Sequence, residues 1–264
     1  TGGPDGDLGS NEILQSKDKT VAIIDGSGVI HDPHGLDREE LVHLAKERKT
    51  ISHFDPSKLS KDGYRVLVED RNLKLPSGEV VPDGFNFRNG AHLRYKADLF
   101  VPCGGRPESI NVTNVQQLIK GETTNYKYIV EGANLFITRQ ARLELEKNGV
   151  FLYPDASANK GGVTSSSLEV LVGLSLTDEE YIQNMLFVDG KPTPFYMNYV
   201  RDIQSIIARN ARGEFEAIWR ENEETGKPRS FVSTDLSRSL NLLSLEIEKT
   251  NLFEQDTLRN TILK

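Results

Sequence analysis

A glycine-rich turn near the start of the chain has residue types suited to binding a nucleotide. Gly3-Pro-Asp-Gly6-Asp-Leu-Gly9 has a G-x-x-G-x-x-G spacing, one residue longer than the dinucleotide-binding fingerprint, and precedes an expected short helix and strand. Glycines let the backbone approach a pyrophosphate, and the free N–H groups at a helix start favour an anion. Asp25 follows the apolar strand expected at 20–24, where a carboxylate can accept hydrogen bonds from an adenosine ribose. Together these features favour NAD as the cofactor.

Two other interpretations of this turn stay open. A turn rich in glycine and aspartate is often a plain connection, and Asp5 and Asp7 would repel a pyrophosphate unless they cap backbone amides and point away. The two carboxylates could instead bind calcium. The EF-hand spacing would need Asp or Asn in place of Gly9 and a glutamate later in register, and the sequence has neither. We therefore expect no metal site.

Strand and helix patterns alternate after this turn. Apolar runs at 97–101, 127–130 and 150–153 are typical of buried strands, and each ends at a polar or glycine-containing turn. Helices are expected at 37–49, where Asp37 and Glu40 form a capping-box pattern, and at 139–148, which Gly149 would end. This alternation favours an α/β fold with a parallel sheet.

Two further regions have their own patterns. Between about 54 and 95, short runs at 64–68, 72–75 and 79–81 predict one or two β-hairpins. From residue 165 onward the apolar residues follow helical spacing, with helices expected at 165–174, 177–187, 196–219 and 234–248. The last third of the chain is therefore expected to be α-helical.

Composition argues against several classes of protein. Apolar residues make up 37% and charged residues 27% of the chain, as in a globular protein, and no run of about 18 apolar residues could span a membrane. The net charge of −7 without a basic stripe argues against nucleic-acid binding. Cys103 is the only cysteine, so we expect no internal disulfide and an intracellular location, in the cytoplasm or the mitochondrial matrix. The thiol is expected to be a small buried group rather than a nucleophile.

Both ends carry the pattern of a longer polypeptide. The glycine-rich turn starts at Gly2 with no strand before it. The apolar series Leu236, Leu240, Leu243 and Ile247 runs toward a final segment at 262–264 without a stop signal. We therefore expect that the first strand of the α/β domain is missing and that the helical segment is truncated.

Four motifs in order resemble the glutamate dehydrogenase signature. They are Val130-Glu-Gly-Ala-Asn134, Tyr153-Pro-Asp155, Asn159-Lys-Gly-Gly-Val163 and Ser166 with Glu169. Segments 1–12, 22–36 and 97–107 resemble the large-subunit, NAD-specific branch of that family, so the likeness covers most of residues 1–175. The resemblance implies a Rossmann-like, doubly wound α/β domain with a mainly parallel sheet over 1–172, including the β-hairpin insertion at about 54–95. A C-terminal α-helical segment over 173–264 would follow.

The resemblance also implies cofactor contacts at single positions. Three loops would meet the dinucleotide, and the expected contacts are Gly3, Gly6, Asp7, Leu8 and Gly9 along the pyrophosphate, Asp25 at the adenosine ribose, Pro102, Cys103 and Gly104 beside the dinucleotide, and Asn134 at the nicotinamide ribose. Asn159 and Ser166 would face the substrate, with the serine donating to its distal carboxylate. Composition alone instead favours 165–167 as a helix-capping cluster without a ligand.

The reaction implied is the oxidative deamination of L-glutamate to 2-oxoglutarate and ammonia with NAD, by a longer parent enzyme that forms a homo-oligomer. We assign no catalytic acid or base here, because the family's catalytic lysine and aspartate lie upstream of the cofactor domain. The chain alone is therefore expected to be inactive. Two alternatives stay open: a dehydrogenase for another amino acid, against which the hydroxyl of Ser166 argues, and a non-catalytic nucleotide-binding or oligomerisation module.

Overall fold

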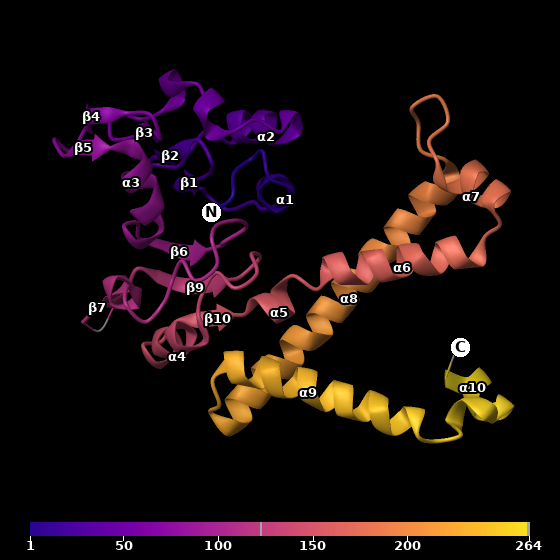
Figure 1. Ribbon diagram of the computed structural model, residues 1–264. Coiled ribbons are helices and arrows are strands. Elements are labelled where there is room, and N and C mark those ends of the chain that lie inside the picture. Colours follow the sequence, from indigo (N-terminus) through magenta and orange to yellow (C-terminus); the bar gives the residue numbers. More distant parts are fainter. Residues whose placement is uncertain (122, 263–264) are drawn as a thin grey trace.

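Two small β-sheets with their helices form one end of the molecule, and a long helical arm extends from them (Figure 1). The computed structural model describes residues 1–121 and 123–262. Residue 1 lies between the two sheets, beside β1 and β6 (Figure 1). The expected continuation of the last segment into 263–264 lies outside the described residues.

The first sheet is antiparallel. Its strands are β1 (Ala22–Ile24), β2 (Gly28–His31) and β3 (Tyr64–Leu67), in the order β1-β2-β3. The helices α1 (Asp7–Gln15) and α2 (Arg38–Glu47) pack on it through a buried cluster that includes Ile13, Ile30 and Leu41. The strand predicted at 20–24 is confirmed, and Asp37 caps α2 as expected, by accepting the Glu40 N–H. The strand β2 was not predicted from the sequence, because Gly28 is typical of a turn.

The second sheet is parallel, as predicted. It contains β6 (Ala97–Phe100), β9 (Tyr126–Val130) and β10 (Phe151–Tyr153), in the order β10-β9-β6. The helix α4 (Arg139–Lys147) connects β9 to β10, and Ala141 and Leu145 bury its inner face. Thr138 caps α4, and Gly149 follows it with a φ of 83°, which suits glycine.

Between the two sheets the predicted hairpin region has mixed structure. One hairpin, β4 (Arg71–Lys74) with β5 (Val80–Asp83), is confirmed, and it turns at Gly78. The run at 64–68 is not part of a separate hairpin, since it is β3 of the first sheet. A short helix that the sequence analysis missed, α3 (Gly84–Gly90), follows β5 and is capped by Asp83. A second small hairpin joins β7 (Ile119–Lys120) to β8 (Thr123–Thr124). Short 3-10 turns are η1 (Ile51–His53), η2 (Pro56–Lys58), η3 (Ala91–Leu93), η4 (Val115–Leu118) and η5 (Leu252–Glu254).

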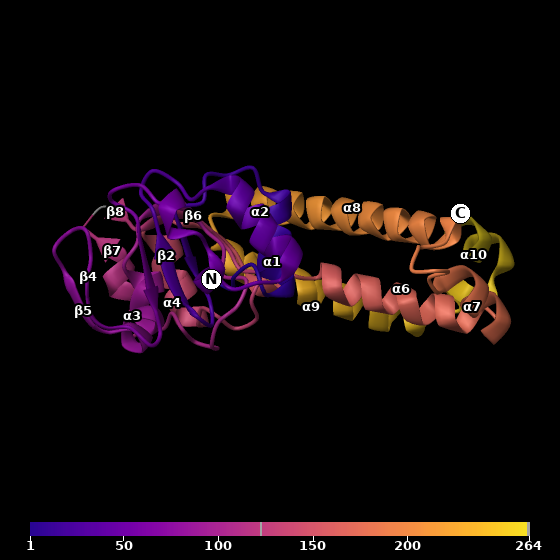
Figure 2. The same cartoon turned by 90° about the horizontal axis from the view of Figure 1, so that it is seen from above.

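The arm is mainly α-helical, as predicted. It contains α5 (Asp155–Ala158), α6 (Gly161–Ser175), α7 (Asp178–Met185), α8 (Pro194–Thr225), α9 (Arg229–Glu248) and α10 (Asp256–Ile262). Seen from above, α8 runs along the arm beside α6 and α9 (Figure 2). The helix expected at 165–174 begins earlier, at Gly161, so the expected start at 165 is wrong. Glycines at 161 and 162 are typical of a loop, but here they form the first turn of α6. The boundary expected at 172 falls inside α6, which continues to Ser175.

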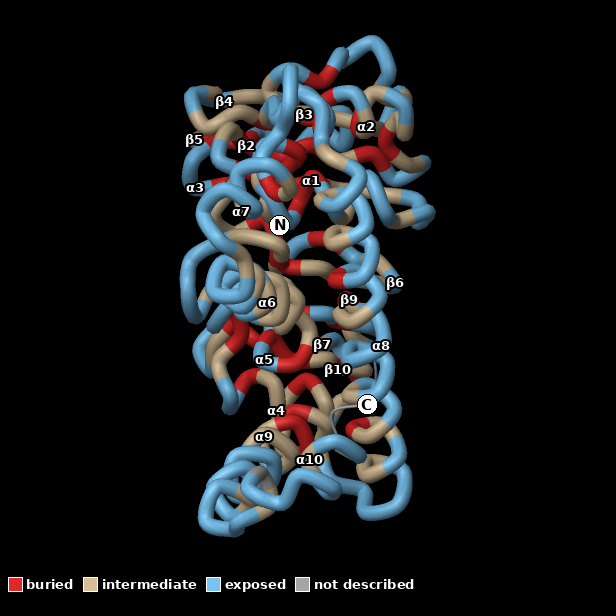
Figure 3. Tube along the Cα trace, turned by 90° about the vertical axis from the view of Figure 1, so that its right-hand side faces the viewer, coloured by how far each residue is buried: buried red, intermediate tan, exposed pale blue. Residues whose placement is uncertain are grey.

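Burial is concentrated in the sheet end of the molecule (Figure 3). In the part of the chain that the structure describes, no residue of α6 is buried, and Val163 and Leu174 are 69% and 79% exposed. Such a mainly apolar helix contributes little to a core of this chain.

One carboxylate joins the arm to the sheet end. Glu146, in the last turn of α4, accepts hydrogen bonds from the backbone N–H of Arg229 at 2.6 Å and from the hydroxyl of Ser230. These groups stand at the start of α9, where the N–H groups lack partners within the helix. The Arg229 guanidinium also stacks over Trp219, 4.2 Å from the ring centroid, which ties the end of α8 to the same point. Glu146 therefore acts as the N-terminal cap of α9.

We expect Glu146→Ala to lower the free energy of unfolding by about 1–3 kcal/mol, because buried donors of α9 lose their acceptor. Urea unfolding followed by circular dichroism measures this change. Glu144→Ala, two residues earlier on the same helix, is the matched control, since the carboxylate of Glu144 makes only long bonds of 3.3 Å. Equal losses in the two variants would show that capping is not the cause.

Candidate functional site

Three loops carry most of the candidate cofactor residues, and backbone hydrogen bonds join them in series. The carbonyl of Thr1 accepts the N–H groups of Cys103 at 2.7 Å and Gly104 at 3.0 Å, which fixes the glycine-rich turn against the loop after β6. The N–H of Ala133 donates to the carbonyl of Pro102 at 2.6 Å, which joins that loop to the one after β9. The structure therefore brings the segments 1–9, 102–104 and 131–134 together at the carboxyl ends of the parallel strands.

The two asparagines predicted from the family signature are in direct contact. The side-chain amide of Asn159, which follows α5, donates to Oδ1 of Asn134 at 2.5 Å and to the carbonyl of Gly132 at 3.0 Å. One was predicted to approach the nicotinamide ribose and the other the substrate, so their contact places the two predicted subsites side by side. These roles themselves stay predictions.

Close packing explains two glycines of the first turn. A Cβ added at Gly9 would overlap the carbonyl oxygens of Gly2 and Gly3, because α1 lies directly on the turn. A Cβ at Gly3 would stand only 2.5 Å from the carboxylate of Asp25. Gly6, the N-cap residue of α1, meets only the Gly3 carbonyl at 3.6 Å, so its outer side is open. The start of α1 is thus fixed against the turn at Gly9 and remains open at Gly6.

Leu8 and Asp7 project from the first turn of α1 in different directions. A Cβ at Gly132 would contact the side chain of Leu8 at 2.5 Å, so Leu8 lies against the loop after β9. The carboxylate of Asp7 pairs with the guanidinium of Arg48 at 2.8 Å. Arg48, which has a left-handed φ of 55° at the end of α2, was not identified from the sequence, because nothing in its local pattern indicates a partner so far away. The pair offsets the negative charge that Asp7 would otherwise present to a phosphate.

The carboxylate of Asp25 is buried and engaged within the protein. Its Oδ1 accepts from the backbone N–H and hydroxyl of Ser27 at 2.8 and 2.7 Å and from the N–H of Gly28 at 3.3 Å. Its Oδ2 accepts the N–H of Ile51 at 2.7 Å, and the residue is only 3% exposed. Asp25 therefore closes the β1–β2 turn and holds η1 against it. Its role at an adenosine ribose stays a prediction.

The loop that carries Asn134 begins at an ion-pair network that was not predicted from the sequence. Arg142 of α4 donates from Nε and Nη2 to the two oxygens of Glu131, at 2.6 and 2.9 Å, and contacts Oδ1 of Asp155 at 2.8 Å. Burial raises the pKa of Glu131 to about 7, although the bonds from Arg142 act in the opposite direction. Glu131 and Asp155 are part of the family signature, whereas Arg142 has no signal beyond its place on a helix.

Ser166 does not open its helix as expected. It lies in the second turn of α6, is exposed, and donates its hydroxyl to the carbonyl of Val163 at 3.1 Å. The N–H groups without helical partners belong to the turn that starts at Gly161. Its hydroxyl shares no hydrogen bond with another candidate residue in the described part of the chain. The contact of Ser166 with a substrate carboxylate therefore stays a prediction. The position of Ser166 in its helix does not support it, because α6 starts at Gly161.

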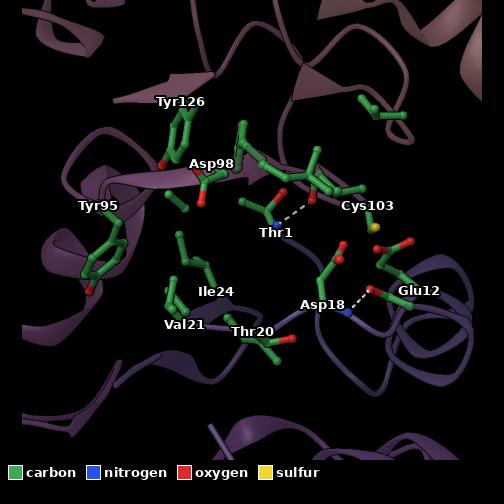
Figure 4. A pocket seen from close by; sticks show the side chains of 18 of the residues that line it. Thr1, Glu12, Asp18, Thr20, Val21, Ile24, Tyr95, Asp98, Cys103 and Tyr126 are labelled. Carbon is green, nitrogen blue, oxygen red and sulfur yellow. Dashed lines mark hydrogen bonds between the residues drawn. The ribbon is translucent and has the colours of Figure 1, made fainter. Parts of the chain in front are cut away.

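A cavity of about 800 Å³ lies beside these loops, between β1 and β6. Figure 4 shows Ile24 and Val21 on one side, Asp98 and Tyr126 on the other, and Thr1 and Cys103 at one end. Thr1 spans this end as a residue of a parallel ladder would: its backbone nitrogen donates to the carbonyl of Val101, and its carbonyl accepts the N–H of Cys103. Gly2 donates to the carbonyl of Ile24 on the other side. The cavity thus separates two strand edges that Thr1 and Gly2 join.

Within residues 1–121 and 123–262, no group of three or more His, Cys, Asp or Glu side chains is arranged to hold a metal ion. None of the helices described there is long and apolar enough to cross a bilayer.

Comparison with known proteins identifies relatives for almost the whole chain. The family model for glutamate/leucine/phenylalanine/valine dehydrogenases matches residues 1–226. A probable NAD-specific glutamate dehydrogenase of Schizosaccharomyces pombe is 58% identical over 266 aligned residues, which are 100% of this chain and 24% of that protein. The NAD-specific glutamate dehydrogenase of Neurospora crassa is 55% identical, over 100% of this chain and 25% of that protein. The chain therefore spans about a quarter of the length of these curated relatives.

Solved structures with this fold are more distant in sequence. A glutamate dehydrogenase of Plasmodium falciparum superposes with a TM-score of 0.58 and 16% identity, over 93% of this chain and 45% of that chain. At this identity the likeness concerns the fold. It agrees with the mixed α/β architecture and the parallel second sheet.

The thiol of Cys103 should react slowly near neutral pH. Burial raises the pKa of this thiol to about 11, so the thiolate forms only in strongly alkaline solution. At pH 8 the thiolate fraction is on the order of a hundredfold below that of a free cysteine. Iodoacetamide labelling followed by mass spectrometry measures the rate, with the urea-unfolded chain as control. Labelling at the same rate in both states would make Cys103 an accessible nucleophile.

Proposed function

Because the chain belongs to the glutamate/leucine/phenylalanine/valine dehydrogenase family, we propose that it is the NAD-binding part of an enzyme that oxidises L-glutamate to 2-oxoglutarate and ammonia. The observation that carries this proposal is 52–58% identity over the whole chain to relatives, two of them named as NAD-specific glutamate dehydrogenases. Because these relatives are about four times as long, the activity is assigned to the longer polypeptide.

The residues at the loop edge fit a dinucleotide. The open N-terminus of α1 presents N–H groups without helical partners, and the Asp7–Arg48 pair reduces the local negative charge. Gly3, Gly6, Leu8 and Gly9 would line the pyrophosphate, Pro102, Cys103 and Gly104 the adjoining part of the cofactor, and Asn134 the nicotinamide ribose. NAD, when bound there, supplies the hydride acceptor.

The contribution of this chain to the reaction is alignment. The contact between Asn134 and Asn159 holds the predicted cofactor and substrate subsites next to each other, which is the requirement for a hydride to move from Cα of the amino acid. Ser166 is the proposed donor to the distal carboxylate of glutamate. We assign no catalytic acid or base to this chain, so proton transfer is attributed to groups elsewhere in the longer polypeptide.

The domain arrangement proposed is a cofactor domain that receives one more strand. The facing edges of β1 and β6 and the ladder bonds of Thr1 fit a strand that runs parallel to both and leads into the glycine-rich turn. Such a strand would join the two sheets into one doubly wound sheet. A homo-oligomeric assembly and an intracellular location, in the cytoplasm or the mitochondrial matrix, complete this proposal.

A second candidate is a dehydrogenase for another amino acid, because the matching family model includes leucine, phenylalanine and valine dehydrogenases. The test is the rate of NADH formation by the purified longer polypeptide with each amino acid. We expect glutamate to be oxidised and the apolar amino acids to be poor substrates. Preference for an apolar amino acid would select the second candidate, and NAD binding without oxidation of any amino acid would indicate a non-catalytic module.

The chain by itself should show no glutamate oxidation, because the proposed proton-transfer groups are not part of it. The same assay, with the chain alone at matched concentration, checks this expectation. NADH formation that scales with the concentration of the chain would contradict it.

We expect Asp25→Ser in the longer polypeptide to narrow the preference for NAD over NADP, because a carboxylate at the ribose repels a 2′-phosphate. The relative kcat/KM for the two cofactors measures this. The variant should also lose about 1.5–3 kcal/mol of folding stability, because the same carboxylate accepts four hydrogen bonds within the protein. The exposed carboxylate of Asp18 provides the control, Asp18→Ser. A lowered melting temperature with an unchanged cofactor ratio would make Asp25 a turn-closing residue only.

A further inference from the structure

Arg142 joins the carboxyl ends of two neighbouring strands. Glu131 immediately follows β9, and Asp155 stands two residues after β10. The guanidinium makes a bidentate pair with Glu131 and a third contact with Asp155, at distances between 2.6 and 2.9 Å. The side chains are 0%, 14% and 10% exposed for Glu131, Arg142 and Asp155, so water hardly competes for these contacts.

A network of this kind is costly to bury. Removing a carboxylate and a guanidinium from water carries a large desolvation penalty, and apolar side chains of similar size would often be as stable. Burial raises the pKa of Glu131 to about 7 despite its bonds to Arg142. We therefore interpret the network as one that fixes the geometry of the neighbouring loop rather than one that stabilises the fold.

The geometry it fixes is that of the loop after β9. The second oxygen of Asp155, Oδ2, accepts the backbone N–H of Leu135 at 2.7 Å. Leu135 has a φ of 58°, a left-handed conformation that costs free energy in a residue other than glycine. Its side chain is 63% exposed, so packing does not compensate this cost. The bond from Asp155 holds the strained residue next to Asn134.

The same network reaches the second asparagine through the backbone. Asp155 is the first residue of α5, and Asn159 directly follows that helix. Asn134 thus follows Glu131 closely in the sequence, and Asn159 follows Asp155 closely. Each asparagine of the Asn134–Asn159 hydrogen bond is therefore near a carboxylate that pairs with Arg142.

We propose that Arg142 is a positioning residue, which through Glu131 and Asp155 fixes the loops of Asn134 and Asn159 relative to each other for hydride transfer. The proposal rests on the proposed function, since it assumes that these loops hold NAD and an amino acid. Glu131 and Asp155 belong to the signature motifs, whereas Arg142 does not.

The test uses Arg142→Lys in the longer polypeptide. A lysine ammonium keeps the charge but cannot make the two-pronged contact with Glu131 and reach Asp155 as well. We expect kcat to fall by roughly ten- to a hundredfold, because small misalignments of reacting atoms have effects of this size. The KM for NAD should change less than kcat, since bonds from Thr1, which do not involve Arg142, also fix the loops at 3–9 and 102–104. The primary isotope effect with α-deuterated glutamate should increase, because hydride transfer becomes slower than the other steps.

Arg139→Lys is the matched control. Arg139 is an exposed arginine one turn earlier on the same helix, and its guanidinium stacks over Phe231, away from both carboxylates. Asp155→Asn is the second variant, because it leaves the Arg142–Glu131 pair in place and weakens the links of this side chain to Arg142, Leu135 and the N–H of Ala156. It should reproduce the fall in kcat and the larger isotope effect without a large loss of stability.

Hydrogen exchange separates this inference from the proposed function. The backbone amides of 132–136 should exchange faster in Arg142→Lys and Asp155→Asn than in the wild type or Arg139→Lys. Unchanged exchange and kcat in both variants would overturn the proposal. A fall in kcat that matches the loss of folded protein, with an unchanged isotope effect, would also overturn it. If the wild type oxidises no amino acid, the proposed function fails, and the exchange of 132–136 alone decides whether Arg142 holds this loop.

Discussion

The direct packing of α1 on the first turn is the contact on which the arrangement of the candidate site depends. Gly9 lies so close to the carbonyls of Gly2 and Gly3 that no side chain fits between helix and turn. The turn in turn is fixed by bonds from Thr1 to the loop after β6 and from Gly2 to β1. These contacts fix the start of α1 relative to the parallel sheet. If the turn moved, Leu8 would lose its contact with the loop after β9 as well.

Local patterns in the sequence predicted the elements that end at the site, but not their neighbours. The runs that became β6, β9 and β10 were recognised because a buried parallel strand is apolar on both faces and stops at a polar turn. β2 was missed because Gly28 ends a turn and starts a strand at once. The start of α6 was missed because two glycines in its first turn oppose the helix locally, and the chain continues directly from α5. In both cases tertiary contacts override a local preference.

Partners far apart in the sequence were beyond such reasoning. Asp25 was interpreted as a ligand from its place after a strand, yet four donors from three separate residues of the protein surround its carboxylate. Arg48 and Arg142 stand on helices where charged residues are common, and only the fold shows that one meets Asp7 and the other two strand ends. A motif identifies the carboxylates at a loop edge, whereas the cations that orient them come from elements that carry no motif.

The helical arm is connected to the site through a second polar cluster. Lys160 and Ser157 both donate to Oε1 of Glu214 on α8, each at 2.6 Å, and Ser157 also contacts the hydroxyl of Ser233 on α9 at 2.6 Å. These residues flank Asn159, so α8 and α9 constrain its position through contacts that do not involve Arg142. The helix α6, whose Val163 and Leu174 are exposed, packs on α8 as well. Asn159 is therefore held by Asp155 at the sheet edge and, through its neighbours Ser157 and Lys160, by the arm, and its bond to Asn134 carries both constraints to the loop after β9.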